Sequence, residues 1–436
     1  MVKGIMSNTK FGKDILITIL GQVIVLLVAF GLNKILSIRL GAAGFGEYSI
    51  AKRTADVIAF STLAGMGIAI PRYLAIYRQK GEKLKEARIL ISGLIIISLL
   101  SLVTLTLLIS FKVPFARIIF GIDGYESYIL PLLLYALTST LTSFSYAYFR
   151  GIDSFYKFNL SQIIVQLSML IVAFIFGGNI ITLLYMWSLV AGLFGITICL
   201  KLGTKYISYA NLKSFKNDLK SYITELVSFS VPRIPGEFVL FAYTVVPLII
   251  ISYKLGVEAS GYFSAAITIN SMINPLFGFI GMVLLPLVSR SIVSNQLLEV
   301  DNTIKLLGYI YLMFGILGIV FVEIFTSLVI DIMFSSDFQS ALPIVRILII
   351  AIVPNSLYLL LRNPIDAISK TPYNTFNLII SFTVLIISSF FSSSTTAFAW
   401  SFVFSYTLLG SLSVITWQMS KNKAYAKDNT NKQGYL

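Results

Sequence analysis

Long apolar runs dominate the chain and alternate with short polar connections. Each run is long enough for a membrane-spanning helix, because a hydrocarbon core of about 30 Å requires about 20 helical residues. The runs are 15–36, 48–70, 89–111, 128–149, 158–177, 180–200, 223–251, 261–285, 306–330, 341–361, 374–391 and 396–418. The pattern therefore predicts an all-α integral membrane protein with about 12 transmembrane helices.

The first half of the chain repeats in the second half. Residues 38–49 align without a gap with residues 253–264, at an offset of 215 residues, and the same offset aligns Pro71 with Pro286. A repeat in an apolar chain is typical of transporters with two related lobes. If each lobe holds an even number of spans, both lobes enter the membrane from the same side, and their symmetry axis runs along the membrane normal.

The repeat and the loop composition together predict the domain organisation. We expect two pseudo-symmetric six-helix lobes, at 1–200 and 223–418, around a central cavity. A basic cytoplasmic linker at 201–222 would join them, and residues 419–436 would form a basic cytoplasmic tail.

Composition and charge agree with a membrane location. Hydrophobic residues make up 57% of the chain and charged residues 12%, whereas soluble domains average about 25% charged residues. The net charge of +14 comes from Lys and Arg that gather in the connections of one side. The positive-inside rule then places both termini in the cytoplasm and the protein in the cell membrane, with lipids rather than nucleic acid around it.

The chain has no histidine and one cysteine, Cys199. These counts exclude a metal site, catalytic triad or proton relay built on histidine, and a disulfide within the chain. No nucleotide-binding or covalent-catalysis motif is present either. We therefore expect no enzyme activity, no catalytic residue, no metal and no cofactor.

Several short motifs resemble those of Wzx-type flippases of polysaccharides and lipid-linked oligosaccharides, within the MATE-like superfamily. The motifs are Leu40-Gly41 with Gly46-Glu47-Tyr48, Gly65-Met66-Gly67 with Pro71-Arg72-Tyr73, Tyr148-Phe149-Arg150-Gly151, and Leu255-Gly256 with Gly261-Tyr262 and Leu285-Pro286. The resemblance implies alternating access through a cavity between two six-span lobes. It also implies a polyprenyl-linked glycan as cargo, with glycan-assembly enzymes as possible partners.

Charged residues inside the predicted spans are the candidate functional groups, because each costs about 2.5–3.5 kcal/mol at the membrane centre. Lys52, Arg53 and Asp56 open the second span, where Asp56 can pair with Lys52 at i+4 or with Arg53 at i+3. The alternative is that both bases lie near the outer interface and extend their charged ends into water.

Arg233 and Glu237 lie deeper, in the seventh span, next to Pro232 and Pro235, which should distort the helix. When the two halves are aligned, Arg233 and Glu237 match Thr18 and Gln22. Arg53 and Asp56 match Thr268 and Ser271, which lie beside Asn270 and Asn274. We predict that Arg53, Arg233, Gln22, Asn270 and Asn274 bind substrate, and that Asp56 and Glu237 orient the arginines or carry a coupling H⁺ or Na⁺. A structural ion pair is the alternative for Arg233 and Glu237, and the main interpretation for Glu323 and Arg346.

The sequence thus favours a flippase for a lipid-linked anionic glycan, since guanidinium groups match phosphate oxygens. An ion-coupled drug or metabolite cation antiporter on the same scaffold is the first alternative, although it would require a more acidic cavity. The second is a membrane glycan polymerase or transferase, for which the longest predicted outer loop offers only Asp123 and Glu126 as carboxylates.

Overall fold

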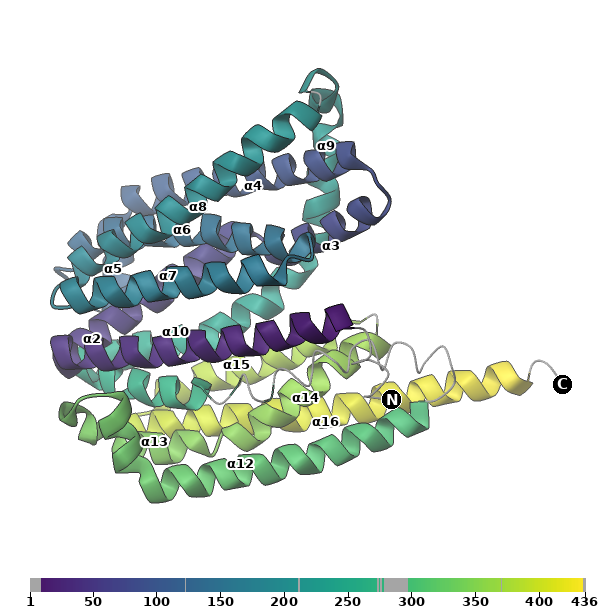
Figure 1. Ribbon diagram of the computed structural model, residues 1–436. Coiled ribbons are helices and arrows are strands. Elements are labelled where there is room, and N and C mark those ends of the chain that lie inside the picture. Colours follow the sequence, from purple (N-terminus) through teal and green to yellow (C-terminus); the bar gives the residue numbers. More distant parts are fainter. Residues whose placement is uncertain are drawn as a thin grey trace. The chain divides into compact units, whose positions relative to one another are not determined.

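The computed structural model describes residues 9–121, 123–210, 212–272, 274, 277, 297–369 and 371–433. The regular elements of this part of the chain are helices (Figure 1). The chain divides into two compact units, Met1–Phe241 and Ala242–Leu436. The predicted all-α membrane fold is confirmed.

Unit 1 contains eight α-helices and a short 3-10 turn within the described residues, and a further helix, α10, crosses the unit boundary. They are α2 (Thr9–Leu63), α3 (Met66–Gln79), α4 (Lys83–Ser110), α5 (Lys112–Phe120), α6 (Glu126–Gly151), α7 (Phe155–Phe176), α8 (Ile180–Ala210), α9 (Leu212–Ser230), η1 (Val231–Arg233) and α10 (Ile234–Leu255). Helix α6 packs against α2, α3, α7 and α8 and is therefore the central helix of this unit (Figure 1).

Unit 2 continues from α10 into a helical segment at 257–272. Its other described elements are α12 (Leu297–Met333), η2 (Ser336–Ala341), α13 (Leu342–Ile349), α14 (Ile352–Ile368), α15 (Tyr373–Phe391) and α16 (Thr395–Gln433). Helix α16 packs against α13, α14 and α15. Buried Asp301 of α12 holds α16 in place by accepting hydrogen bonds from Trp417 Nε1 at 3.1 Å and Lys421 Nζ at 3.0 Å.

Nine helices of the described chain are long and apolar enough to cross a membrane. The segments Ser336–Ile349 and Ile352–Ile368, bent by 48° at their junction, make a tenth if they cross as one span. Helix α2 counts once, although its apolar part, Leu20–Leu63, has 44 residues. At 1.5 Å per residue that length is about 66 Å, enough for two crossings. The predicted spans 15–36 and 48–70 both overlap this region, although the second continues into α3. The predicted span 261–285 extends beyond the described residues.

The repeat is visible in the backbone. Gly41 interrupts α2 at φ 63°, and Gly256, its partner in the repeat, lies between α10 and the following helix at φ 90°. A residue with a side chain is strained at such positive φ values, so glycine is required at both breaks. The sequences Phe158-Asn159-Leu160 and Phe376-Asn377-Leu378 are also similar, and both asparagines are buried.

The described residues of the predicted linker, 201–222, are helical. Helix α8 continues to Ala210, and α9 begins at Leu212. Helix α9 packs against α3 and α4 of unit 1, and the division between the units falls later, inside α10. The placement of two six-span lobes at 1–200 and 223–418 remains a prediction.

A proline in α3 explains why two of the sequence motifs meet. Pro71 has no N–H, so the carbonyl of Gly67, four residues earlier, loses its helical donor. Arg150, near the end of α6, replaces that donor through Nη2 at 2.9 Å. The helices approach closely here because the next residue is a glycine: a Cβ on Gly151 would lie 2.9 Å from Pro71 Cα.

We expect Arg150→Gln to lower the stability of the protein by about 1 kcal/mol, the net contribution of one hydrogen bond at a partly exposed position. In a Pro71→Ala background the restored N–H can reach the Gly67 carbonyl, so the same substitution should cost less. Thermal unfolding of the four proteins in detergent measures this coupling. Arg78→Gln, an exposed arginine on the same helix, is the control. Equal losses in both backgrounds would contradict the explanation.

Candidate functional site

The charged cluster of α2 contains an ion pair. Lys52 Nζ lies 2.7 Å from Asp56 Oδ2, with one third of each side chain exposed. The i+4 pairing, one of the two that the sequence allowed, is therefore present. Arg53, the intervening base, is half-buried and interacts electrostatically with Asp56 and Tyr48.

Aromatic side chains form the wall behind this cluster. Tyr48 of α2 and Tyr135 of α6 are buried, and both contact the Trp187 ring of α8 at centroid distances of 5.7 and 5.6 Å. Their hydroxyl groups are close enough to interact electrostatically with Lys52. The cluster thus lies on a rigid surface made by three packed helices.

Gln22 lies in a polar contact between α2 and α7. Its Nε2 donates to Gln162 Oε1 at 2.7 Å, and one turn earlier Asn159 Nδ2 donates to Thr18 Oγ1 at 3.2 Å. The sequence analysis missed Asn159 and Gln162 as partners. Their i, i+3 spacing within an apolar span was the available signal, because it places both amides on one face of a helix.

The predicted asparagines of unit 2 are both described. Asn274 Oδ1 accepts a hydrogen bond from Asn355 Nδ2 of α14 at 2.8 Å. Asn270 is buried, and among the described residues no donor reaches its Oδ1. Asn355 was missed, although a Pro-Asn-Ser sequence inside an apolar span was a signal for it.

The side chains of Arg233 and Glu237 lie outside the described residues, so their roles remain predictions. Their backbone is described: α9 ends at Ser230, the 3-10 turn Val231–Arg233 follows, and α10 begins at Ile234. The distortion predicted for the neighbouring prolines is therefore confirmed.

Glu323 and Arg346 form the ion pair that the sequence predicted. Arg346 Nε lies 3.5 Å from Glu323 Oε2 and 3.3 Å from Thr326 Oγ1. The pair connects α12 to α13, which agrees with a structural bridge. Within the described chain, no three His, Cys, Asp or Glu side chains gather into a group that could hold a metal ion.

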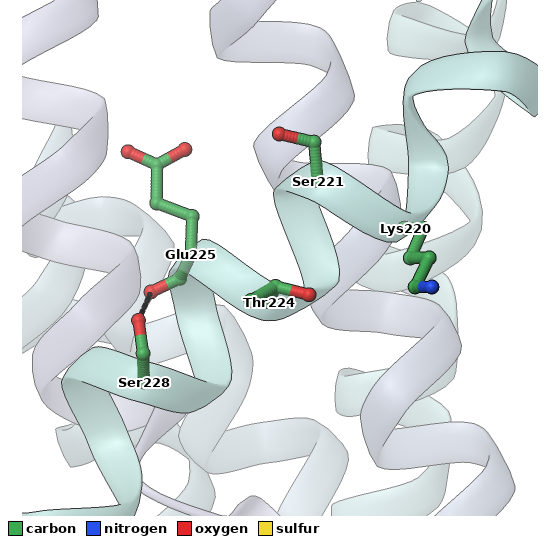
Figure 2. Close-up of a pocket in the computed structure, with 5 residues that line it drawn as sticks. All are labelled: Lys220, Ser221, Thr224, Glu225 and Ser228. Atoms are coloured by element: carbon green, nitrogen blue, oxygen red, sulfur yellow. Dashed lines mark hydrogen bonds between the residues drawn. The ribbon is translucent and has the colours of Figure 1, made fainter.

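Helix α9 is attached to unit 1 by polar contacts on one face. Arg88 of α4 pairs with Asp218 at 2.5 Å, and the Tyr77 hydroxyl of α3 donates to Glu225 at 2.9 Å. Burial and this hydrogen bond raise the pKa of Tyr77, so the phenol stays protonated and continues to donate. Glu225 also borders an open hollow on α9, where the Ser228 hydroxyl donates to its backbone carbonyl (Figure 2). The hollow is also lined by Lys220, Ser221 and Thr224.

Comparison with solved structures shows the fold. A multidrug resistance MATE family transporter of the MOP superfamily, in an inward-facing conformation, matches with a TM-score of 0.74 and 11% identity over 93% of this chain and 95% of that one. A mutant of the MATE transporter VcmN from Vibrio cholerae matches with a TM-score of 0.64 and 13% identity, over 95% and 99%. A MOP superfamily transporter from Pyrococcus furiosus matches with a TM-score of 0.63 and 15% identity, over 94% of both chains.

No curated protein matches the sequence. The family model described as "Polysaccharide biosynthesis protein" matches residues 11–292. Since this match covers well over half of the chain, the protein belongs to the polysaccharide biosynthesis family, and its fold is that of the MATE-like transporters.

Proposed function

We propose that the protein is a flippase that moves a lipid-linked oligosaccharide, a glycan on polyprenyl phosphate or pyrophosphate, across the cytoplasmic membrane by alternating access. Family membership places it in polysaccharide biosynthesis, and the fold is that of transporters. The observation that carries the choice of cargo is the group of Lys52, Arg53 and Asp56, which holds two positive charges and one negative charge.

The excess positive charge favours an anionic cargo. The guanidinium of Arg53 is the better candidate for a phosphate ligand, because its planar fork suits phosphate oxygens. Arg233 would be the second such group. The amides of Gln22, Asn270 and Asn274 would contact sugar hydroxyls, because an amide both donates and accepts hydrogen bonds.

The remaining features of the proposal concern coupling and location. Asp56 or Glu237 would carry a coupling H⁺ or Na⁺, and no other cofactor is proposed. Both termini would lie in the cytoplasm, since the basic connections share one side of the predicted topology. Enzymes that assemble or polymerise the glycan would be its functional partners.

A cation or drug antiporter remains the second candidate, because the solved relatives include multidrug transporters. Such a protein would place net negative charge where its cargo binds. One solved MOP superfamily relative, from Pyrococcus furiosus, is described as having a binding pocket of reverse polarity that suggests a different function. A glycan polymerase or transferase is the third candidate, and no described group of residues favours it.

Arg53→Ala should lower glycan flipping roughly 10- to 100-fold, the loss expected when charge-assisted hydrogen bonds to phosphate are removed. Arg53→Lys should recover part of the rate, because the charge is kept and the fork is lost. Translocation of a lipid-linked glycan in proteoliposomes measures both. Arg39→Ala, an exposed arginine of the same helix near the Phe174 ring, is the control. Full activity in Arg53→Ala would remove this residue from the mechanism, and export of organic cations without flipping would favour the antiporter.

The ion pair offers a test of coupling. If Asp56 carries the coupling ion, Asp56→Asn should abolish the response of transport to an imposed proton or sodium gradient, and the double variant Lys52→Gln/Asp56→Asn should behave the same. If the pair is only structural, the double variant should recover what the single variant loses, because no unpaired charge remains. Transport with and without the gradient separates the two results.

Single cysteines should show whether the predicted residues share one aqueous path, since thiolates react only where water reaches them. The positions are Gln22, Arg53, Asp56, Arg233 and Glu237, each in a Cys199→Ser background. All five should react with a small charged thiol reagent from the membrane side to which the cavity opens. If the cysteines that replace Arg233 and Glu237 are protected from the reagent in both the inward- and the outward-open state, a structural ion pair at these positions is indicated.

A further inference from the structure

We propose that Arg72 and Arg150 form a binding site for the phosphate group of a membrane lipid, at the end of unit 1 where α3 packs against α6 and α9. The inference stands apart from the proposed function, because the phosphate of any membrane lipid would satisfy the geometry. It concerns an end of unit 1 that contains two of the sequence motifs and none of the residues proposed above to contact cargo.

The backbone contact described for α3 and α6 brings together the two segments that carry these arginines. A Cβ on Gly151 would lie 2.9 Å from Pro71 Cα. Arg150 precedes Gly151 and Arg72 follows Pro71 in the sequence. The two side chains therefore leave the chain on either side of one tight helix–helix contact.

An aromatic ring orients each guanidinium group. Arg72 Cζ lies 4.4 Å from the centroid of the Phe229 ring of α9, and Arg150 Cζ lies 5.6 Å from that of Phe158 of α7. A guanidinium held against a ring keeps its edge N–H groups available for an anion. Arg150 uses one N–H on the Gly67 carbonyl. Among the described residues, no acceptor takes a hydrogen bond from Arg72.

The acidic residues of this region have other partners or lie apart. Glu225 accepts from Tyr77, and Asp218 pairs with Arg88. Asp153 follows Arg150 in the next loop and is exposed, and no ion pair joins the two in the described structure. Arg72 and Arg150 are both exposed, so the pair keeps its positive charge where a ligand can reach it.

The surroundings favour a lipid over a soluble anion. Ile68, one residue from the carbonyl that Arg150 contacts, is 45% exposed, and Tyr156, two residues from Phe158, is 61% exposed. Apolar side chains beside paired cations match a headgroup phosphate with its hydrocarbon chains. Two guanidinium edges should favour a phosphomonoester or pyrophosphate over a phosphodiester, because the first two carry more charge and more terminal oxygens.

The test uses the full chain in phosphatidylcholine nanodiscs that contain phosphatidic acid, phosphatidylglycerol or undecaprenyl pyrophosphate, with bound lipid counted by native mass spectrometry. We expect phosphatidic acid and undecaprenyl pyrophosphate to be retained in preference to phosphatidylglycerol. Arg72→Gln should lower that retention about 10-fold, the effect of one lost charge-assisted contact. Arg72→Lys should retain binding but lose most of the preference for the monoester.

Arg78→Gln is the matched control, because Arg78 is an exposed arginine of α3 to which the structure assigns no ring contact. It should leave retention unchanged. Equal losses in Arg72→Gln and Arg78→Gln, or equal retention of phosphatidic acid and phosphatidylglycerol by the wild type, would overturn the proposal in favour of general surface charge. Retention of only phosphatidic acid would identify a phospholipid site, and retention of only undecaprenyl pyrophosphate a carrier site.

Discussion

A backbone carbonyl that loses its helical donor must find another one, and this requirement determines how the helices of unit 1 meet. In an apolar medium an unsatisfied carbonyl is costly. Pro71 removes the donor for Gly67, and Arg150 replaces it from α6. This hydrogen bond joins the end of α6 to α3. Helix α3 in turn contacts α9 through the hydrogen bond from Tyr77 to Glu225. One missing N–H thus explains why motifs some 80 residues apart in sequence occur together.

The sequence could predict what depends on local chemistry. The length of the apolar runs predicted most of the spans. The alignment of the two halves also paired Gly41 with Gly256, and the structure shows a positive φ at both. Hydropathy alone did not indicate the helix α9, because its polar residues Asp218 and Glu225 are used in contacts with α4 and α3. A polar helix that docks on a neighbour and a polar loop have similar compositions.

The candidate site was only partly predictable because its partners come from distant parts of the chain. Gln22 meets Gln162, 140 residues away, and Asn274 meets Asn355, 81 residues away. Helical spacing places such amides on one face of a helix, but it does not show which neighbouring helix that face contacts. Spacing also left two partners open for Asp56, and the structure shows the ion pair with Lys52.

The charges of Lys52, Arg53 and Asp56 bear on whether the protein selects an anionic or a cationic cargo. A charged side chain in a membrane helix costs about 2.5–3.5 kcal/mol, and pairing recovers part of that cost. Lys52 and Asp56 recover it from each other, and Arg53 adds a second positive charge to the group. An anionic cargo can neutralise this positive charge while it is bound, and the charge is restored when the cargo leaves. A transporter of anionic lipid-linked sugars requires such transient neutralisation.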